Sequence, residues 1–174
     1  MSNNKKAEVW LRGSIEGIPA LLQPVAHALL QAREEIHELL HDFPETLLWE
    51  RPGGVASVGF HLQHLAGVLD RLFTYAEGDM LSQYQLDYLK AEGVPDEHIS
   101  LSSLLYALDV QLDKVLTRLK NIDPASVMEA RSVGRQHLPS TVMGLLFHAA
   151  EHTMRHTGQL LVTVRILKKQ PVNN

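Results

Sequence analysis

The chain has 174 residues and contains no cysteine. This absence excludes disulfides, cysteine-ligated zinc sites and a thiol nucleophile supplied by the protein itself. No apolar run approaches the roughly 18 residues that a membrane-spanning helix needs. Lys and Arg form no cluster typical of a nucleic-acid-binding protein, and the net charge is −4. Any metal bound here must therefore be held by His, Asp or Glu.

The composition, 45% apolar and 21% charged, is typical of a globular protein. The length fits a single domain spanning residues 1–174. The first residues, MSNNKKAEVW, carry charge but no following apolar segment, unlike a secretory signal. We therefore expect a cytoplasmic protein with neither nucleic acid nor membrane as a partner.

Strand signals are nearly absent, and four segments instead carry apolar residues at alternating spacings of three and four. These stripes run from Val25 to Phe43, Leu62 to Ala76, Leu104 to Leu119 and Leu145 to Leu167. Such spacing predicts amphipathic helices. We expect an all-α fold, an antiparallel four-helix bundle, with a shorter helix around 81–91. Residues 1–15 are expected to form an arm, and 122–138 an irregular long crossover.

Several residues predict where these helices begin and end. Ser57 is a plausible N-cap of the second long helix and Gly78 its C-cap. Ser100 or Ser102 is expected to open the third long helix. Pro139 is expected to be the first residue of the last one, because proline is tolerated in a first helical turn.

Histidines are the residues most suited to carry chemistry. His148, His152 and His156 stand four apart, and His61 and His64 stand three apart. Residues at these spacings share one face of a helix. Two histidine-bearing helices packed together can therefore supply three or four imidazole ligands to one metal ion.

His152 and His156 occupy positions where the apolar stripe of the last helix expects Leu or Val. Burying two adjacent imidazoles without partners is costly. They are either core histidines hydrogen-bonded to backbone or carboxylate groups, or part of a metal site or active-site cavity, which we favour. His148 lies about 12 Å from His156 along the helix axis, so all three cannot comfortably hold one ion.

On the second long helix, the choice between the two histidines stays open. Helical periodicity puts His61 at the edge of the apolar arc and His64 slightly further out, which slightly favours His61 as the inward residue. Either side chain can reach across a bundle interface.

Two other metal motifs compete with this interpretation. HAAEH at 148–152 matches the inverted zinc-protease pattern, in which Glu151 would be the general base, but no acidic residue follows His152. Glu34–His37 and Glu38–His41 have the spacing of di-iron carboxylate ligands, but both pairs lie on one helix. We interpret His37 and His41 as part of a solvated face.

The phrases SVGFHLQHLAG, DRLFTYAEG and EHTMRHTGQLL resemble the DinB-like (DinB/YfiT) superfamily over essentially the whole chain. The resemblance implies a four-helix bundle, usually a homodimer, with a three-histidine metal site. Its motifs fall here on His64, His152 and His156, which makes His61 and His148 neighbours of the site. Thr157 stands where many relatives have Arg, so any role of that Arg is not carried over.

The resemblance also implies metal-dependent transfer of a low-molecular-weight thiol, such as bacillithiol or mycothiol, to a small-molecule substrate. Imidazole ligation suits a divalent ion, zinc or nickel above all. Three imidazoles leave a coordination position open, and a thiol bound there would ionise near neutral pH. The alternatives are a metal-dependent hydrolase and a non-catalytic, stress-associated metal-binding module. No catalytic residue beyond the ligands follows from the sequence.

Overall fold

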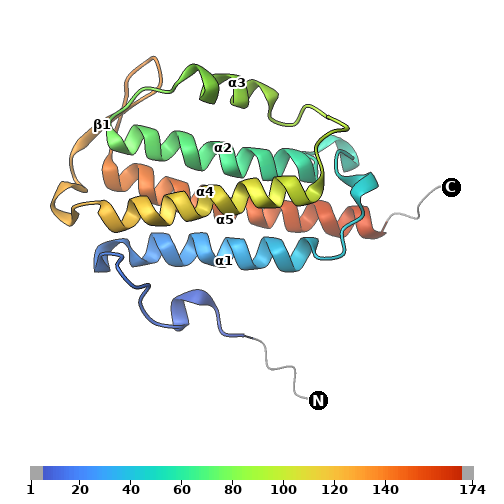
Figure 1. Ribbon diagram of the computed structural model, residues 1–174, viewed down its shortest axis with the longest axis horizontal. Helices are drawn as coiled ribbons and strands as arrows, with labels where there is room; N and C mark the ends of the chain where they lie inside the picture. Colours follow the sequence, from blue (N-terminus) through green and yellow to red (C-terminus); the bar gives the residue numbers. More distant parts are fainter. Residues whose placement is uncertain (1–5, 170–174) are drawn as a thin grey trace.

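The computed structural model describes residues 6–169. Four long helices pack side by side: α1 (Gln23–Leu40), α2 (Val58–Glu77), α4 (Leu101–Asn121) and α5 (Val142–Lys169) (Figure 1). A shorter helix, α3 (Gln83–Ala91), lies outside them. The predicted all-α four-helix bundle is thereby confirmed. The 3₁₀ turns span Val9–Leu11, Ala20–Leu22, Glu45–Leu47, Pro52–Gly54 and Pro124–Ser126.

The antiparallel arrangement expected from the sequence holds for some neighbouring helices and not for others (Figure 1). α2 runs antiparallel to α5, and α1 runs antiparallel to α4, whereas α2 and α4 share one direction. The shared direction arises because residues 78–100, which include α3, carry the chain back along the outside of the bundle. The contacts of α5 with α2 and α1, and of α2 with α4, are the most extensive.

Local capping chemistry fixes the helix boundaries as the sequence predicts. The Ser57 side chain accepts a hydrogen bond from the backbone N–H of Phe60 at the start of α2. Gly78 ends α2 in the left-handed conformation, with φ +91°. Ser100, rather than Ser102, is the N-cap of α4 and accepts from the N–H of Ser103. Each of these caps satisfies helix-end groups that would otherwise lack partners.

The segment between α4 and α5 corrects two expectations. It contains an antiparallel hairpin of β1 (Ala130–Val133) and β2 (Leu138–Thr141), so 122–138 is not entirely irregular. Pro139 lies in β2 opposite Ser132, and α5 begins three residues later, at Val142. A proline fits there because an edge strand tolerates the missing N–H. The hairpin was missed because its strands are only four residues long and lack apolar alternation.

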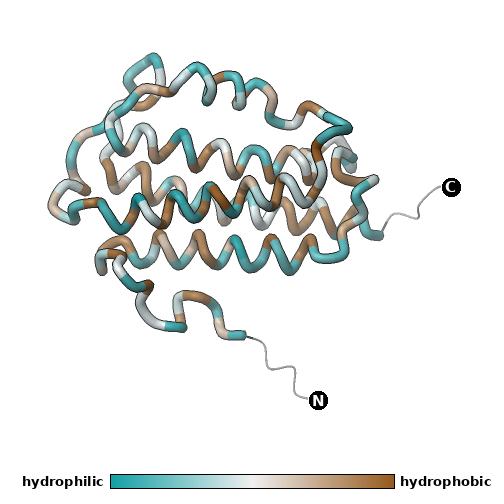
Figure 2. The backbone as a smooth tube through the Cα atoms, viewed as in Figure 1, coloured by the Kyte–Doolittle hydropathy of each residue, from teal (hydrophilic) through white to brown (hydrophobic). Residues whose placement is uncertain are grey.

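The core forms where the apolar stripes of the helices meet. In Figure 2 hydrophobic residues recur along each long helix between hydrophilic ones. The largest fully buried side chains come from α1, α2, α4 and the segments flanking α1: Leu22, Leu29, Ile36, Leu40, Leu48, Leu62, Leu65, Leu69, Phe73, Leu108, Leu112 and Leu119. Leu146 and Leu160 of α5 are fully buried as well. This burial, worth about 25 cal/mol per Å² of apolar surface, holds the helices together.

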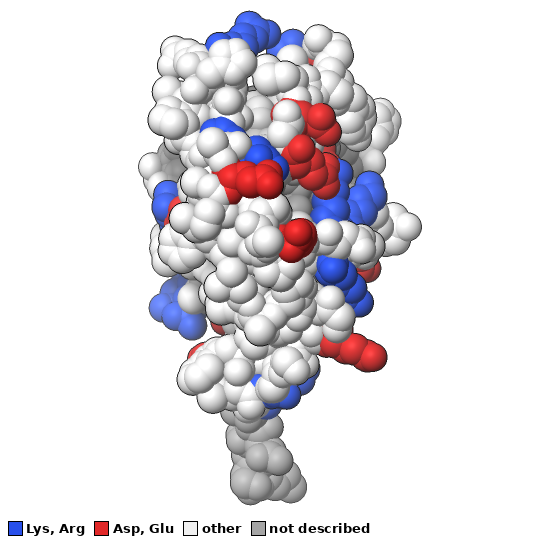
Figure 3. Space-filling model, turned by 90° about the vertical axis from the view of Figure 1, so that its left-hand side faces the viewer, with Lys and Arg blue, Asp and Glu red and all other residues white. Residues whose placement is uncertain are grey.

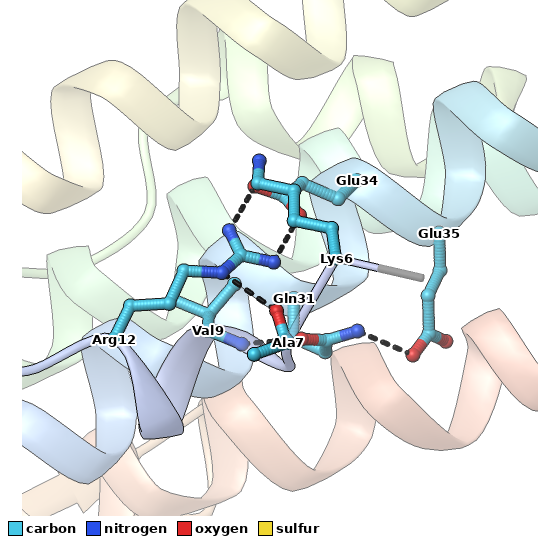
Figure 4. Close-up of polar contacts among 7 residues, drawn as sticks. All are labelled: Lys6, Ala7, Val9, Arg12, Gln31, Glu34 and Glu35. Atoms are coloured by element: carbon cyan, nitrogen blue, oxygen red, sulfur yellow. Dashed lines mark hydrogen bonds and ion pairs between the residues drawn. The ribbon is translucent and has the colours of Figure 1, made fainter. Parts of the chain in front are cut away.

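The described part of the arm, residues 6–15, is held on α1 by polar contacts (Figure 4). Arg12 binds both carboxylate oxygens of Glu34, at 2.6 and 2.8 Å. The N–H of Val9 donates to Gln31 Oε1 at 2.8 Å. The hydrogen bonds from Arg12 and Lys6 lower the pKa of Glu34 to about 2. Residues 1–5 of the expected arm lie outside the described residues.

The surface carries both signs of charge. On the end of the molecule that Figure 3 shows, acidic and basic side chains are interspersed among uncharged ones, and no continuous basic patch is visible on this face. Among residues 6–169, no helix is long and apolar enough to cross a membrane.

Candidate metal centre

Three histidines from two antiparallel helices meet in the bundle. His64 comes from α2, and His152 and His156 come from successive turns of α5. One ring nitrogen of each lies within 4.8 Å of the others. His64 Nε2 is 2.9 Å from His152 Nε2, and the His156 ring centroid is 4.5 Å from each of the other two. This group of histidines can hold one metal ion.

His61 is the most buried histidine at the site, as its helical position indicates. It is only 2% exposed, and its Nδ1 lies 3.1 Å from His156 Nδ1. His64 is half-buried and lies one turn further along the same side of α2. Periodicity thus predicted the burial of His61, but the nitrogens that gather within 4.8 Å belong to His64 and the two α5 histidines.

The environment favours neutral imidazoles at this site. Burial, followed by the nearby His64, lowers the pKa of His61 to about 4. The same causes lower the pKa of His152 to about 4 and that of His156 to about 3. Burial acts because a charged ring loses hydration, and the neighbouring rings add repulsion between like charges. These three rings are therefore neutral near pH 7, the form that can donate a lone pair to a metal.

One buried polar atom of the cluster has no hydrogen-bond partner among residues 6–169. His152 Nδ1 is buried and makes no hydrogen bond to any residue among 6–169. Buried polar atoms normally find partners, and exceptions concentrate at functional sites. His152 Nε2 meets only another imidazole nitrogen, His64 Nε2. Imidazole nitrogens that face one another in this way suit a divalent cation between them.

A carboxylate that the sequence reasoning missed contacts the site. Glu92, just beyond α3, places Oε2 2.7 Å from His64 Nδ1 and Oε1 2.6 Å from Arg71 Nη1. Its side chain is only 3% exposed. No motif marks this residue, since it stands in the unremarkable sequence KAEGVP and meets His64 only through the fold.

The competing motifs are not assembled in the same way. His148, which is exposed, lies 2.6 Å from Glu151, and these two with His152 also bring ligand atoms within 4.8 Å. Arg155 pairs with the same Glu151 at 2.5 Å, and its positive charge opposes a cation there. The histidines of the di-iron spacing are exposed: His37 bonds Asp109, and His41 lies beside Asp42.

Thr157, at the position where the family resemblance implies Arg, faces the interior. It is 2% exposed, and its hydroxyl donates to the carbonyl of Thr153 at 2.8 Å. The charged group nearest in sequence is Arg155, which points to a surface cavity. That cavity, of about 520 Å³, is lined by Val55, Ala56, His61, Arg155, Gly158, Gln159, Val162 and Thr163. The interior of α5 therefore carries no guanidinium at position 157.

Solved structures share this arrangement of helices. A conserved protein from Enterococcus faecalis superposes with a TM-score of 0.69 at 17% identity, covering 86% of this chain and 98% of that one. A protein from Streptococcus pneumoniae gives a TM-score of 0.61 at 14% identity, covering 83% and 88%. At these identities the likeness concerns the fold. No curated protein matches the sequence.

The family follows from the sequence itself. The model of the DinB superfamily matches residues 28–160, a segment that contains α1 from its second turn, all of α2 to α4, and the histidines of α5. This range is well over half of the 174 residues. The chain belongs to the DinB superfamily.

Proposed function

We propose that His64, His152 and His156 bind one divalent ion, zinc or nickel. The observation that carries this proposal is the convergence of three ring nitrogens within 4.8 Å from two packed helices. The lowered pKa values of the two α5 histidines support it, because their rings stay unprotonated near neutral pH. Imidazole nitrogen suits both metals, and affinity of such sites rises from manganese toward copper.

We further propose that the protein is a metal-dependent transferase that uses a low-molecular-weight thiol. A divalent ion held by His64, His152 and His156 would act as a Lewis acid and would lower the pKa of a thiol bound to it. The chain lacks cysteine, so a nucleophilic sulfur has to come from a second molecule. His64, His152 and His156, which would hold the ion, are half-buried.

The cavity beside His61 favours a small-molecule reaction over a closed metal-binding module. It has a volume of about 520 Å³, within the range of sites that bind small ligands. His61 lines this cavity, and its Nδ1 lies 3.1 Å from His156 Nδ1. Arg155 and Gln159 supply its polar lining, which suits an anionic or hydrogen-bonding group on the thiol or the electrophile. A metal-dependent hydrolase is the second enzymatic candidate, since a thiol and water compete for the same position.

Metal analysis of protein purified without a histidine tag tests the metal site. Wild type is expected to bind one Zn²⁺ or Ni²⁺ per chain, and His152→Ala and His156→Ala to lose stoichiometric binding. His148→Ala is the matched control, because it removes an exposed histidine from the same helix. Equal loss in the control, or a greater loss, would show that the ligand assignment is wrong.

Two further expectations from the sequence stay predictions. We expect a homodimer, which light scattering tests by giving twice the monomer mass of 19.5 kDa. We also expect a cytoplasmic protein, which cell fractionation tests.

A further inference from the structure

The side chain of Glu92 is fixed between two residues of α2. One carboxylate oxygen lies 2.7 Å from His64 Nδ1, and the other lies 2.6 Å from Arg71 Nη1. Both partners are largely enclosed, with 17% and 9% of their side chains exposed. A buried carboxylate is costly unless each oxygen is paired, and here both are.

The backbone next to Glu92 is anchored as well. The N–H of Gly93 donates to Oε1 of the buried Gln63 at 2.7 Å. Gly93 has φ +79° and packs so closely on Phe60 that a Cβ would lie 2.8 Å from its ring. Phe60 in turn stacks on His64, with centroids 5.2 Å apart and planes 9° apart. The loop that carries Glu92 is thus held against α2 by the hydrogen bond to Gln63 and by the packing on Phe60.

Gly67 makes room for the ion pair. Any side chain there would collide with Glu92 Oε1, with Arg71 Nη1 at 2.6 Å and with Tyr88 at 2.8 Å. A glycine inside a helix costs roughly 1 kcal/mol relative to alanine. At this position its lack of a side chain is what allows the carboxylate and guanidinium to lie against α2.

The contact determines which nitrogen of His64 is free. An ionised carboxylate only accepts hydrogen bonds, so the contact requires a proton on His64 Nδ1. In the neutral ring the lone pair is then on Nε2. Nε2 is the atom that faces His152, at 2.9 Å. The hydrogen bond therefore points the lone pair of His64 toward the other two histidines.

We propose that Glu92 is a positioning residue that fixes the tautomer and ring orientation of His64 for metal binding, and that Arg71 holds the Glu92 carboxylate in place. This inference rests on the proposed three-histidine site. Outer carboxylates that orient metal-bound histidines raise ligand basicity, and their loss costs about 10–100-fold in metal affinity. Glu92 itself does not contact the ion; it acts through His64.

The test compares two carboxylate-to-amide variants by titration with Zn²⁺. Glu92→Gln keeps the shape of the side chain and is expected to weaken Zn²⁺ binding by about 10-fold or more. Asp70→Asn is the matched control, because Asp70 also links α2 to the α3 segment, through Gln85 Nε2 at 2.7 Å, without touching His64. If Asp70→Asn binds Zn²⁺ with near-wild-type affinity, the weaker binding of Glu92→Gln is due to the lost contact with His64. Equal losses would overturn the proposal, since both would then reflect loosening of α3.

A second measurement uses the metal-free protein. Nitrogen NMR of the imidazoles is expected to show His64 protonated at Nδ1 in wild type and in Asp70→Asn, and as a mixture of tautomers in Glu92→Gln. An unchanged tautomer in Glu92→Gln would overturn the proposal even if metal affinity fell. If wild type binds no Zn²⁺, the proposed metal site fails, while the tautomer still reports whether Glu92 controls His64.

Discussion

Gly67 lies directly beneath the carboxylate of Glu92, on the face of α2 from which His64 also projects. The two residues are 25 positions apart in the chain, and the connection 78–100 brings them together. A hydrogen atom at position 67 thus provides the space for an ion pair that supports the candidate metal centre.

Replacing Gly67 by alanine is therefore expected to destabilise the protein. The added methyl group displaces Glu92 and Arg71, and overpacking of this kind costs about 1–3 kcal/mol. Chemical denaturation measures the free energy of unfolding. Gly158→Ala is the control, because a Cβ there meets nothing within 4 Å, and this helical change is expected to stabilise by about 0.5–1 kcal/mol. If both substitutions increased the free energy of unfolding equally, the side chains around position 67 would not be crowded as the structure indicates.

The buried histidines predict that the metal-free protein loses stability in acid. The pKa of His61 is about 4 and that of His156 about 3 in the folded chain, against about 6.5 when unfolded. Below about pH 6.5 the unfolded chain takes up protons that the folded chain does not, so unfolding becomes easier as the pH falls. Melting temperatures measured from about pH 7 to about pH 4.5 should therefore decrease.

The non-titrating variant His61→Gln tests the source of that decrease. It removes the histidine that is 2% exposed and should give a shallower dependence of the melting temperature on pH. An identical pH dependence in wild type and variant would mean that the acid sensitivity arises elsewhere in the chain.

Metal affinity should resist mild acid. Metal ligands must be deprotonated, and the pKa values of His152 and His156 lie near 4 and 3. We expect the apparent Zn²⁺ affinity to fall less between about pH 7 and pH 6 than three imidazoles of ordinary pKa would give, because two of the three proposed ligands have lowered values. Competition titrations with a chelator measure this affinity. A fall in that range as large as three ordinary imidazoles would give contradicts the prediction.

Turnover should depend on both the metal and an added thiol. Bacillithiol, mycothiol and glutathione are screened against model electrophiles, and wild type is expected to exceed His156→Ala in rate with at least one of them. The variant Arg155→Gln tests the role of the cavity next to His61. The substitution changes the lining of that cavity and leaves the three ring nitrogens in place. Equal rates for wild type and His156→Ala would leave only background chemistry and remove the transferase proposal.

Much of the fold could be predicted because its signals are local. Ser57, Gly78 and Ser100 act on groups within four residues of themselves, so their roles follow directly from the sequence. Pro139 was placed wrongly because a proline suits both the first turn of a helix and an edge strand. The hairpin, whose strands pair only with each other, settles which of these occurs.

The candidate site was predictable in its histidines but not in its surroundings. Spacing on α5 picked out His152 and His156, since both interrupt an apolar stripe. Periodicity on α2 could not choose between His61 and His64, because both side chains reach α5 in the structure. Glu92 carries no signal of its own, since its partner His64 lies 28 residues away and the path between them depends on how the loop docks.

Because 88 residues separate His64 from His152, the proposed metal site can form only after both residues have been synthesised. During synthesis, His64 leaves the ribosome long before α5 does. A single imidazole binds a metal ion only weakly. The complete set of nitrogens exists only after the last helix has packed against α2. At the proposed site, uptake of the ion would therefore follow the packing of α5 against α2.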